Sequence, residues 1–172
     1  GSARWVGSWA SIAASELGVP MTMMTEALFA RFVAARRDER QKLSGSYAGA
    51  PSPHISLEWN DLKEAYQLAR IMNHHQGFQL IQAASQRHNW QVNMPQLARI
   101  WTNGCIIRSE LMQAATTYLA ETSDLMQNQD VAKWIRNHKI SLQKTVGALS
   151  FSHLAYPCLM AALAALNGST TA

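Results

Sequence analysis

The residues best suited to binding chemistry in this sequence are five basic residues between positions 31 and 42. They are Arg31, Arg36, Arg37, Arg40 and Lys42, and they share the segment with Asp38 and Glu39. A guanidinium group stays charged at physiological pH and can donate two parallel N–H bonds to phosphate oxygens. One or two of these arginines could therefore bind an anion; the alternative is a solvated helix face with internal ion pairs. Nucleic-acid binding would require a larger basic excess with interleaved aromatic residues, so we expect no nucleic-acid partner.

The cysteines and histidines do not follow the spacing of metal ligands. Cys105 and Cys158 are far apart and form no CxxC motif, which argues against both a zinc site and a disulfide framework and fits a reducing, cytoplasmic environment. None of the six histidines has another four residues away, and the adjacent His74 and His75 point to different sides of a helix. We therefore expect no metal site, and we expect Cys105 to be a small buried side chain rather than a nucleophile.

The composition predicts one domain with extensive buried surface. The chain has 172 residues, of which 48% are hydrophobic and only 15% are charged, with a formal net charge of +4. So few charges indicate faces buried against the chain's own core or against a partner, and we expect self-association. From Thr145 to Ala172 there is no Asp, Glu, Lys or Arg, but the longest apolar run, Cys158 to Leu166, is too short to span a membrane. This stretch predicts two buried helices that meet at Pro157, and no membrane partner.

The periodicity of apolar residues predicts an all-α fold, a single multi-helix domain. Gly18 is suited to end a first helix, and Pro20 is suited to open the second. The segment 44–56, rich in Gly, Ser and Pro, is the clearest loop. Gly77 lies inside a long predicted helix, where it suggests close contact with another helix. The expected helices cover about residues 8–17, 20–42, 57–88, 107–120, 130–151 and 157–166, with a further short helix that begins at 93–95 and is closed by Gly104.

Several blocks of sequence resemble one enzyme family. WTNGCIIRS at 101–109 resembles a block of decarboxylating 6-phosphogluconate dehydrogenases that is quite specific to them. Segment 16–44, with GVP, EALFAR and RDER, and segment 69–93, with QGF and a later Trp, resemble two further blocks in the same order and spacing. The pair Pro157-Cys158, followed by a helix rich in Ala and Leu, resembles a fourth. The resemblance runs from about Arg4 to Leu166, with a loop difference near residues 45–56, and it is to the family's helical C-terminal domain.

The resemblance implies a fold, an activity and partners. Enzymes of this family oxidise 6-phosphogluconate with NADP and release CO2 to give ribulose 5-phosphate. They join a Rossmann domain to a large helical domain and act as homodimers, in which a C-terminal tail reaches the neighbouring subunit's active site. This sequence contains neither a GxGxxG or GxAxMG motif nor the family's KMVHNGIEYG block with its catalytic lysine and glutamate. We therefore assign no catalytic residue and no cofactor site to these 172 residues, and expect no reduction of NADP by them alone.

Two arginines are the substrate-binding residues that the resemblance implies. The family binds the substrate phosphate through the arginine of its FAR motif, which matches Arg31, and through the lysine of a KGTGxW motif. A gapless alignment puts Arg4 at that lysine, with Trp5 and Val6 in place of the motif's glycine and threonine. A rival alignment puts Trp5 at the motif's tryptophan and needs a four-residue insertion. Arg108 has no catalytic role by this resemblance and is expected in a buried ion pair.

Two interpretations of the chain remain open at this point. Gly1-Ser2 is typical of the pair left when a protease removes an affinity tag, so we expect the domain to comprise residues 3–172. This favours a C-terminal domain that works with a Rossmann half, contributing dimerisation and one wall of the substrate pocket. The departures at Trp5 and Val6 favour the other interpretation, a stand-alone, non-catalytic domain for dimerisation or metabolite binding.

Overall fold

The computed structural model describes residues 2–47, 49, 51 and 53–171, and their side chains from residue 7 onward. All regular structure in these residues is helical, as predicted. The elements are α1 (Ser2–Leu17), α2 (Thr22–Ala35), α3 (Arg37–Ser46), α4 (Trp59–His88), α5 (Met94–Ile100), α6 (Glu110–Glu121), the 3₁₀ turn η1 (Leu125–Gln127), α7 (Gln129–Ser150) and α8 (Pro157–Thr170).

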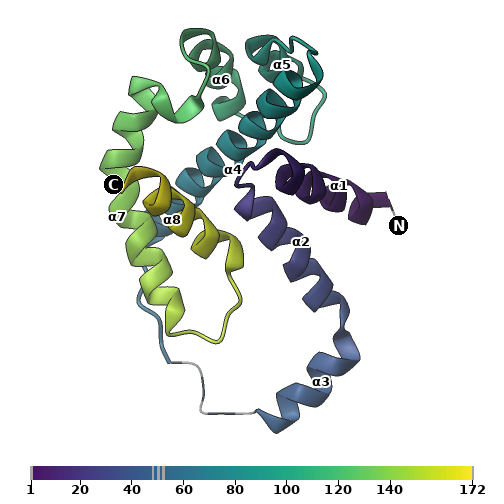
Figure 1. Cartoon of the computed structure of the whole chain (residues 1–172). Helices are drawn as coiled ribbons and strands as arrows, with labels where there is room; N and C mark the ends of the chain where they lie inside the picture. Colours follow the sequence, from purple (N-terminus) through teal and green to yellow (C-terminus); the bar gives the residue numbers. More distant parts are fainter. Residues whose placement is uncertain (1, 48, 50, 52, 172) are drawn as a thin grey trace.

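The long helix α4 lies at the centre of the fold, and most of the other helices pack around it (Figure 1). α7 and α8 pack against it along one side, the α1–α2 pair contacts it near its middle, and α5 and α6 pack together near its C-terminal end. Its core face includes Leu68, which is fully buried, and Met72, which is 1% exposed. Opposite them lie other buried side chains: Met112 of α6, Leu125 of η1, Leu142 of α7 and Leu166 of α8. One core therefore holds segments from both halves of the chain.

A polar cluster joins the first turns of α4 to the middle of α7. The hydroxyl oxygen of Ser141, which is 3% exposed, lies 2.9 Å from Asp61 Oδ1 and 2.6 Å from Glu64 Oε2. Lys144 Nζ donates to the other oxygen of Asp61 at 3.3 Å. The hydrogen bond from Ser141 is the main cause that lowers the pKa of Glu64. These contacts set the register of α7 on α4, because each is made between fixed positions of the two helices.

Several helix ends follow the predicted signals. Gly18 ends α1 with a φ of 67°, in the left-handed region that favours glycine. The side chain of Asn93 accepts a hydrogen bond from the backbone N–H of Gln96 and so caps α5. Pro157 occupies the first position of α8, where its missing N–H costs nothing. Helix α4 begins two residues after the predicted start and ends at His88, as expected.

The predicted single helix over 20–42 is wrong, because the structure has two. Arg36, with φ −86° and ψ 58°, interrupts it and separates α2 from α3. Helix α3 buries no residue and stands away from the other helices (Figure 1). Its only large apolar side chain, Leu43, is 48% exposed, so α3 has no apolar stripe that would hold it in line with α2 on the core.

Three further expectations from the sequence are not met. A Cβ built on Gly77 would have nothing within 4 Å, so this glycine does not mark a close helix contact among the described residues. Arg108 is exposed rather than buried in an ion pair, because the segment between α5 and α6 runs over the surface. Cys105, in the same segment, is half-buried instead of buried.

No helix within the described residues is long and apolar enough to cross a membrane.

Acidification should destabilise the fold through His74 of α4. Its ring nitrogen Nδ1 lies 2.7 Å from the carbonyl oxygen of Arg70, and burial is the main cause that lowers its pKa below 6.5. Because the folded-state pKa is depressed, the unfolded chain binds the proton more readily, so stability falls as the pH drops below about 6.5. Urea unfolding at pH 7.5 and pH 5.5 should show this loss, and His74→Gln should reduce it. An equal loss in the variant would assign the acid sensitivity to other groups.

Candidate functional site

The two arginines implied by the resemblance fall on the neighbouring helices α1 and α2, which form an antiparallel hairpin. A Cβ built on Gly7 of α1 would lie 3.2 Å from Leu28 Cδ1 of α2, so the helices approach closely there. One turn further toward the apex, the hydroxyls of Ser11 and Thr25 are 3.2 Å apart. One turn beyond the Gly7–Leu28 contact, away from the loop that joins the two helices, α1 has position 4 and α2 has Arg31. The two helices diverge in that direction (Figure 1).

Gln76 of α4 fixes the start of α2 and therefore the position of this hairpin. Its side chain is 3% exposed. Its Oε1 accepts a hydrogen bond from the backbone N–H of Met23 at 3.1 Å, and its Nε2 donates to Thr22 Oγ1 at 3.0 Å. The residue preceding α2, Met21, provides no side-chain cap. A side chain from another helix thus satisfies an N–H group at the start of α2 that would otherwise lack a partner.

Arg31 is available for a ligand. Its side chain is exposed on α2, and no carboxylate of the described residues forms an ion pair with it. If Arg31 had a purely structural role, Glu39 would be a suitable ion-pair partner for it. Instead, Glu39 Oε2 lies 3.6 Å from a guanidinium nitrogen of Arg36. An exposed guanidinium at the open end of a fixed hairpin can donate to an anion without first breaking an internal ion pair.

The second predicted residue, Arg4, belongs to the first turn of α1. Its side chain lies outside the residues whose side chains the structure describes, as do those of Trp5 and Val6. Its role therefore stays a prediction. The rest of the basic segment does not converge on Arg31, because Arg37 and Arg40 belong to the separate helix α3.

The described residues do not fit a dinucleotide cofactor. Such a cofactor binds its pyrophosphate at a glycine-rich turn between a strand and a helix. No strand occurs in the residues that the structure describes, and the two glycines with positive φ there, Gly18 and Gly104, follow helices. Nor do the described residues contain a group of three or more His, Cys, Asp or Glu side chains placed to hold a metal ion. Among the described side chains, the hairpin offers a possible ligand one exposed arginine at its open end, Arg31.

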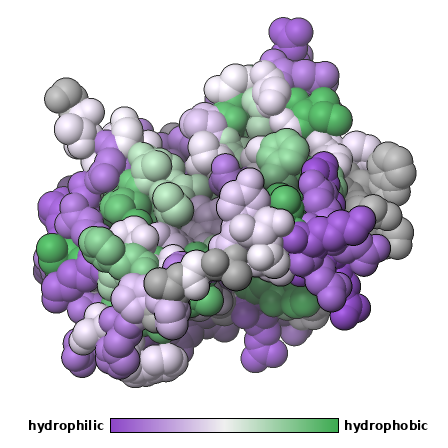
Figure 2. Space-filling view, turned by 90° about the horizontal axis from the view of Figure 1, so that it is seen from below, coloured by the Kyte–Doolittle hydropathy of each residue, from purple (hydrophilic) through white to green (hydrophobic). Residues whose placement is uncertain are grey.

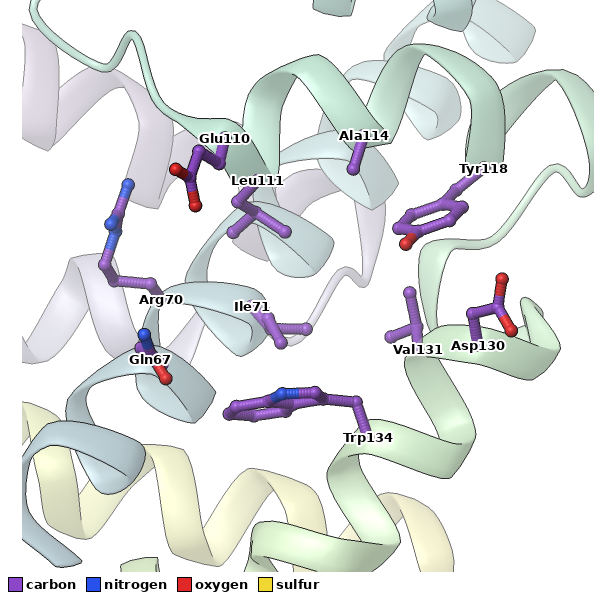
Figure 3. Close-up of a pocket in the computed structure, with 10 residues that line it drawn as sticks. All are labelled: Gln67, Arg70, Ile71, Glu110, Leu111, Ala114, Tyr118, Asp130, Val131 and Trp134. Carbon is purple, nitrogen blue, oxygen red and sulfur yellow. The ribbon is translucent and has the colours of Figure 1, made fainter. Parts of the chain in front are cut away.

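A pocket of about 580 Å³ between α4, α6 and α7 is a second hollow that the sequence did not predict (Figure 3). Its lining comes from three helices distant in sequence, so no local motif indicates it. It is lined by Gln67, Arg70, Ile71, Glu110, Leu111, Ala114, Tyr118, Asp130, Val131 and Trp134. Arg31 is not among the lining residues, so this pocket is separate from the candidate anion site.

Comparisons with known proteins converge on one family. The family model described as "6-phosphogluconate dehydrogenase, C-terminal domain" matches residues 3–172. The decarboxylating 6-phosphogluconate dehydrogenase of Drosophila melanogaster is 32% identical over 176 residues, covering 98% of this chain and 37% of that protein. The NADP(+)-dependent, decarboxylating 6-phosphogluconate dehydrogenase of Bacillus subtilis is 30% identical, covering 98% of this chain and 38% of that protein. The chain thus spans well under half the length of these relatives.

A solved structure agrees with the sequence comparisons. The chain superposes on 6-phosphogluconate dehydrogenase of Plasmodium falciparum with a TM-score of 0.89 and 27% identity, covering 95% of this chain and 37% of that one. That enzyme was solved in its apo form, with its cofactor NADP+ and with its substrate 6-phosphogluconate. The all-helical arrangement described above therefore matches a part of that enzyme.

Proposed function

The chain belongs to the 6-phosphogluconate dehydrogenase family, as its C-terminal domain, and from this membership we propose that it is the helical domain of an NADP-dependent oxidative decarboxylase. In this role it contributes part of the site for the phosphate of 6-phosphogluconate and part of the contact between two subunits. The parent reaction converts 6-phosphogluconate to ribulose 5-phosphate and CO2. A cytoplasmic location suits such an enzyme and its two free thiols, Cys105 and Cys158.

The observation that carries the proposal is the placement of Arg31. It stands exposed toward the open end of the α1–α2 hairpin, and no carboxylate of the described residues forms an ion pair with it. Two guanidinium groups at that end would offer a phosphate several N–H donors and two positive charges. The share of this chain in the reaction is to bind and orient the substrate. The redox and proton-transfer chemistry belongs to the Rossmann domain and catalytic residues of the parent protein.

We expect 6-phosphogluconate to bind this chain weakly and through Arg31. Each charge-assisted hydrogen-bonded contact contributes roughly 1.5–3 kcal/mol, so two arginines would give a Kd on the order of millimolar. Arg31→Ala should weaken binding at least about tenfold. Isothermal titration calorimetry at low and moderate salt would measure this, with gluconate as the ligand that lacks the phosphate.

Arg40→Ala is the matched control, because Arg40 is also exposed but belongs to α3. It should leave the affinity nearly unchanged. Arg36 is a poorer control, since it forms the α2–α3 junction and pairs with Glu39. Equal losses from Arg31→Ala and Arg40→Ala would indicate a diffuse basic surface and contradict the proposal. Binding of gluconate as tightly as 6-phosphogluconate would do the same.

A second candidate function is a stand-alone, non-catalytic domain that dimerises or senses a phosphorylated sugar acid. It is favoured by Trp5 and Val6, which replace the glycine and threonine of the family's phosphate-binding motif. Val6 has no hydroxyl to donate, and Trp5 lacks the freedom of a glycine backbone to approach an anion closely. The two functions separate when the chain is joined to the part of a relative that carries both the Rossmann domain and the KMVHNGIEYG block: reduction of NADP in the chimera would favour the enzyme domain.

We expect the chain to form a homodimer. Many large apolar side chains are exposed, among them Trp9 (64%), Phe29 (54%) and Val33 (59%) on the α1–α2 hairpin and Ile106 (101%) between α5 and α6. Figure 2 shows hydrophobic surface mixed with polar surface on the lower face as well. Burying such side chains against a partner is favourable by about 25 cal/mol per Å². Sedimentation velocity should give a species of twice the 19.1 kDa chain mass, and a monomer at micromolar concentration would contradict this.

A further inference from the structure

Two aromatic side chains, Trp134 and Tyr118, line the pocket between α4, α6 and α7. Trp134 of α7 forms its floor and Tyr118 of α6 lies on the opposite side, with the side chain of Val131 between them (Figure 3). Both aromatic side chains are half-buried, so one part of each ring packs on the protein while another part faces the hollow. The volume of about 580 Å³ is within the range of sites that bind small organic molecules.

Trp134 is held in place before any ligand arrives. The His138 ring stacks on the indole, with ring centroids 4.1 Å apart and an interplanar angle of 15°. A ring nitrogen of His138 lies 2.7 Å from the carbonyl oxygen of Trp134, which fixes the imidazole in turn. His138 therefore covers one face of the indole, and the Trp134 side chain itself lines the pocket. A platform fixed in this way loses little conformational entropy when a ligand binds.

The charges around the pocket favour a cation. Its ionisable lining residues are Arg70, Glu110 and Asp130, which carry a net charge of −1 when all three are ionised. Arg70 and Glu110 lie at the same end of the pocket (Figure 3), so their charges largely offset each other there, and the guanidinium is also 5.8 Å from the Tyr66 ring. Asp130 stands at the other end, near Val131 and Tyr118, as an exposed carboxylate (Figure 3).

We propose that this pocket binds an alkylated ammonium ion, with the cationic head over the indole face of Trp134 that His138 leaves open, Tyr118 on the opposite side of the pocket, and Asp130 as its counter-charge. The electron-rich faces of tryptophan and tyrosine attract such cations, and tryptophan does so most strongly. Aliphatic lining from Ile71 and Leu111 accepts the methyl groups of the ligand without leaving a polar atom unpaired. Nothing in this proposal depends on the anion site, which lies on other helices.

The test uses choline and its neutral isostere 3,3-dimethylbutan-1-ol, which differ in charge but hardly in shape. We expect choline to bind the chain at least about tenfold more tightly, as followed by ligand NMR and by the indole N–H signals at matched chloride concentration. Trp134→Leu should weaken choline binding about tenfold, and Trp134→Phe should weaken it less, because an aromatic face remains. Asp130→Asn, at an exposed position that leaves the core intact, should weaken choline but not the isostere.

Two control substitutions outside the pocket test whether the loss of choline binding is specific to the pocket. Trp59→Leu, at a 76% exposed tryptophan on α4 outside the pocket, should leave choline binding unchanged, and so should Arg31→Ala. Choline binding no tighter than that of the isostere would overturn the proposal, as would equal losses from Trp59→Leu and Trp134→Leu. If Asp130→Asn instead shifts the sedimenting mass while choline has no effect, the pocket is an interface between copies of the chain, and the proposal fails.

Discussion

Replacing Leu142 by alanine is expected to lower the free energy of unfolding by about 2–5 kcal/mol. Leu142 is fully buried on α7, in the core that joins this helix to α4 and α8. Alanine would lose the burial of three carbon atoms and would leave a cavity that helices fixed by the Ser141 contacts cannot close completely. Urea denaturation followed by circular dichroism would measure the change at a fixed protein concentration.

Ile140→Ala is the matched control, because Ile140 lies two residues away on the same helix and is 55% exposed. It should change the free energy of unfolding by about 0.5 kcal/mol or less. A small effect of Leu142→Ala, similar to that of the control, would mean that α7 is not part of the cooperative core. That result would contradict the packing of α7 on α4.

Replacing Gln76 by methionine is expected to cost about 1–3 kcal/mol of stability. The substitution keeps most of the volume but removes the acceptor for the backbone N–H of Met23 and the donor to Thr22 Oγ1. Since Met23 is 5% exposed, its N–H would remain buried without a partner of comparable strength. The hairpin would lose its main polar tie to α4, so the affinity for 6-phosphogluconate should fall as well.

Thermal unfolding together with calorimetric titration would measure both effects. Gln86→Met is a suitable control, because Gln86 is an exposed glutamine in the last turns of the same helix. It should alter neither stability nor ligand affinity appreciably. If Gln76→Met lowered stability but left the affinity unchanged, the link between this hydrogen-bonded tie and the anion site would be refuted.

The sequence predicted the helices well where their ends depend on local chemistry. Gly18, Asn93 and Pro157 each satisfy or relieve a backbone group within one turn, so their effect can be read without knowledge of the rest of the chain. The long helix α4 could also be predicted, because the apolar residues between Leu62 and Ala83 keep helical spacing. Arg31 could be named only through the FAR motif, since its local sequence resembles an ordinary solvated helix face.

What the sequence did not predict depends on contacts between distant segments. The break at Arg36 carries no Gly or Pro signal; it occurs where the apolar stripe of α2 ends and the exposed α3 has no core face. The cap of α2 by Gln76 joins residues more than fifty positions apart. The pocket around Trp134 needs three helices. The exposure of Arg108 follows from the path of the segment between α5 and α6.

The pairing of α4 with α7 has a consequence for how the chain is made on the ribosome. Asp61 and Ser141, which lie in contact, are separated by 80 residues, so α4 leaves the exit tunnel long before its main packing partner exists. At about 5–20 residues per second, its apolar face waits roughly 4–16 seconds for α7. During that interval the hairpin of α1 and α2 is the available cover for Leu80, which clusters with Ala14 and Met21. The remaining face, around Leu68 and Met72, is the surface that a nascent-chain chaperone would meet.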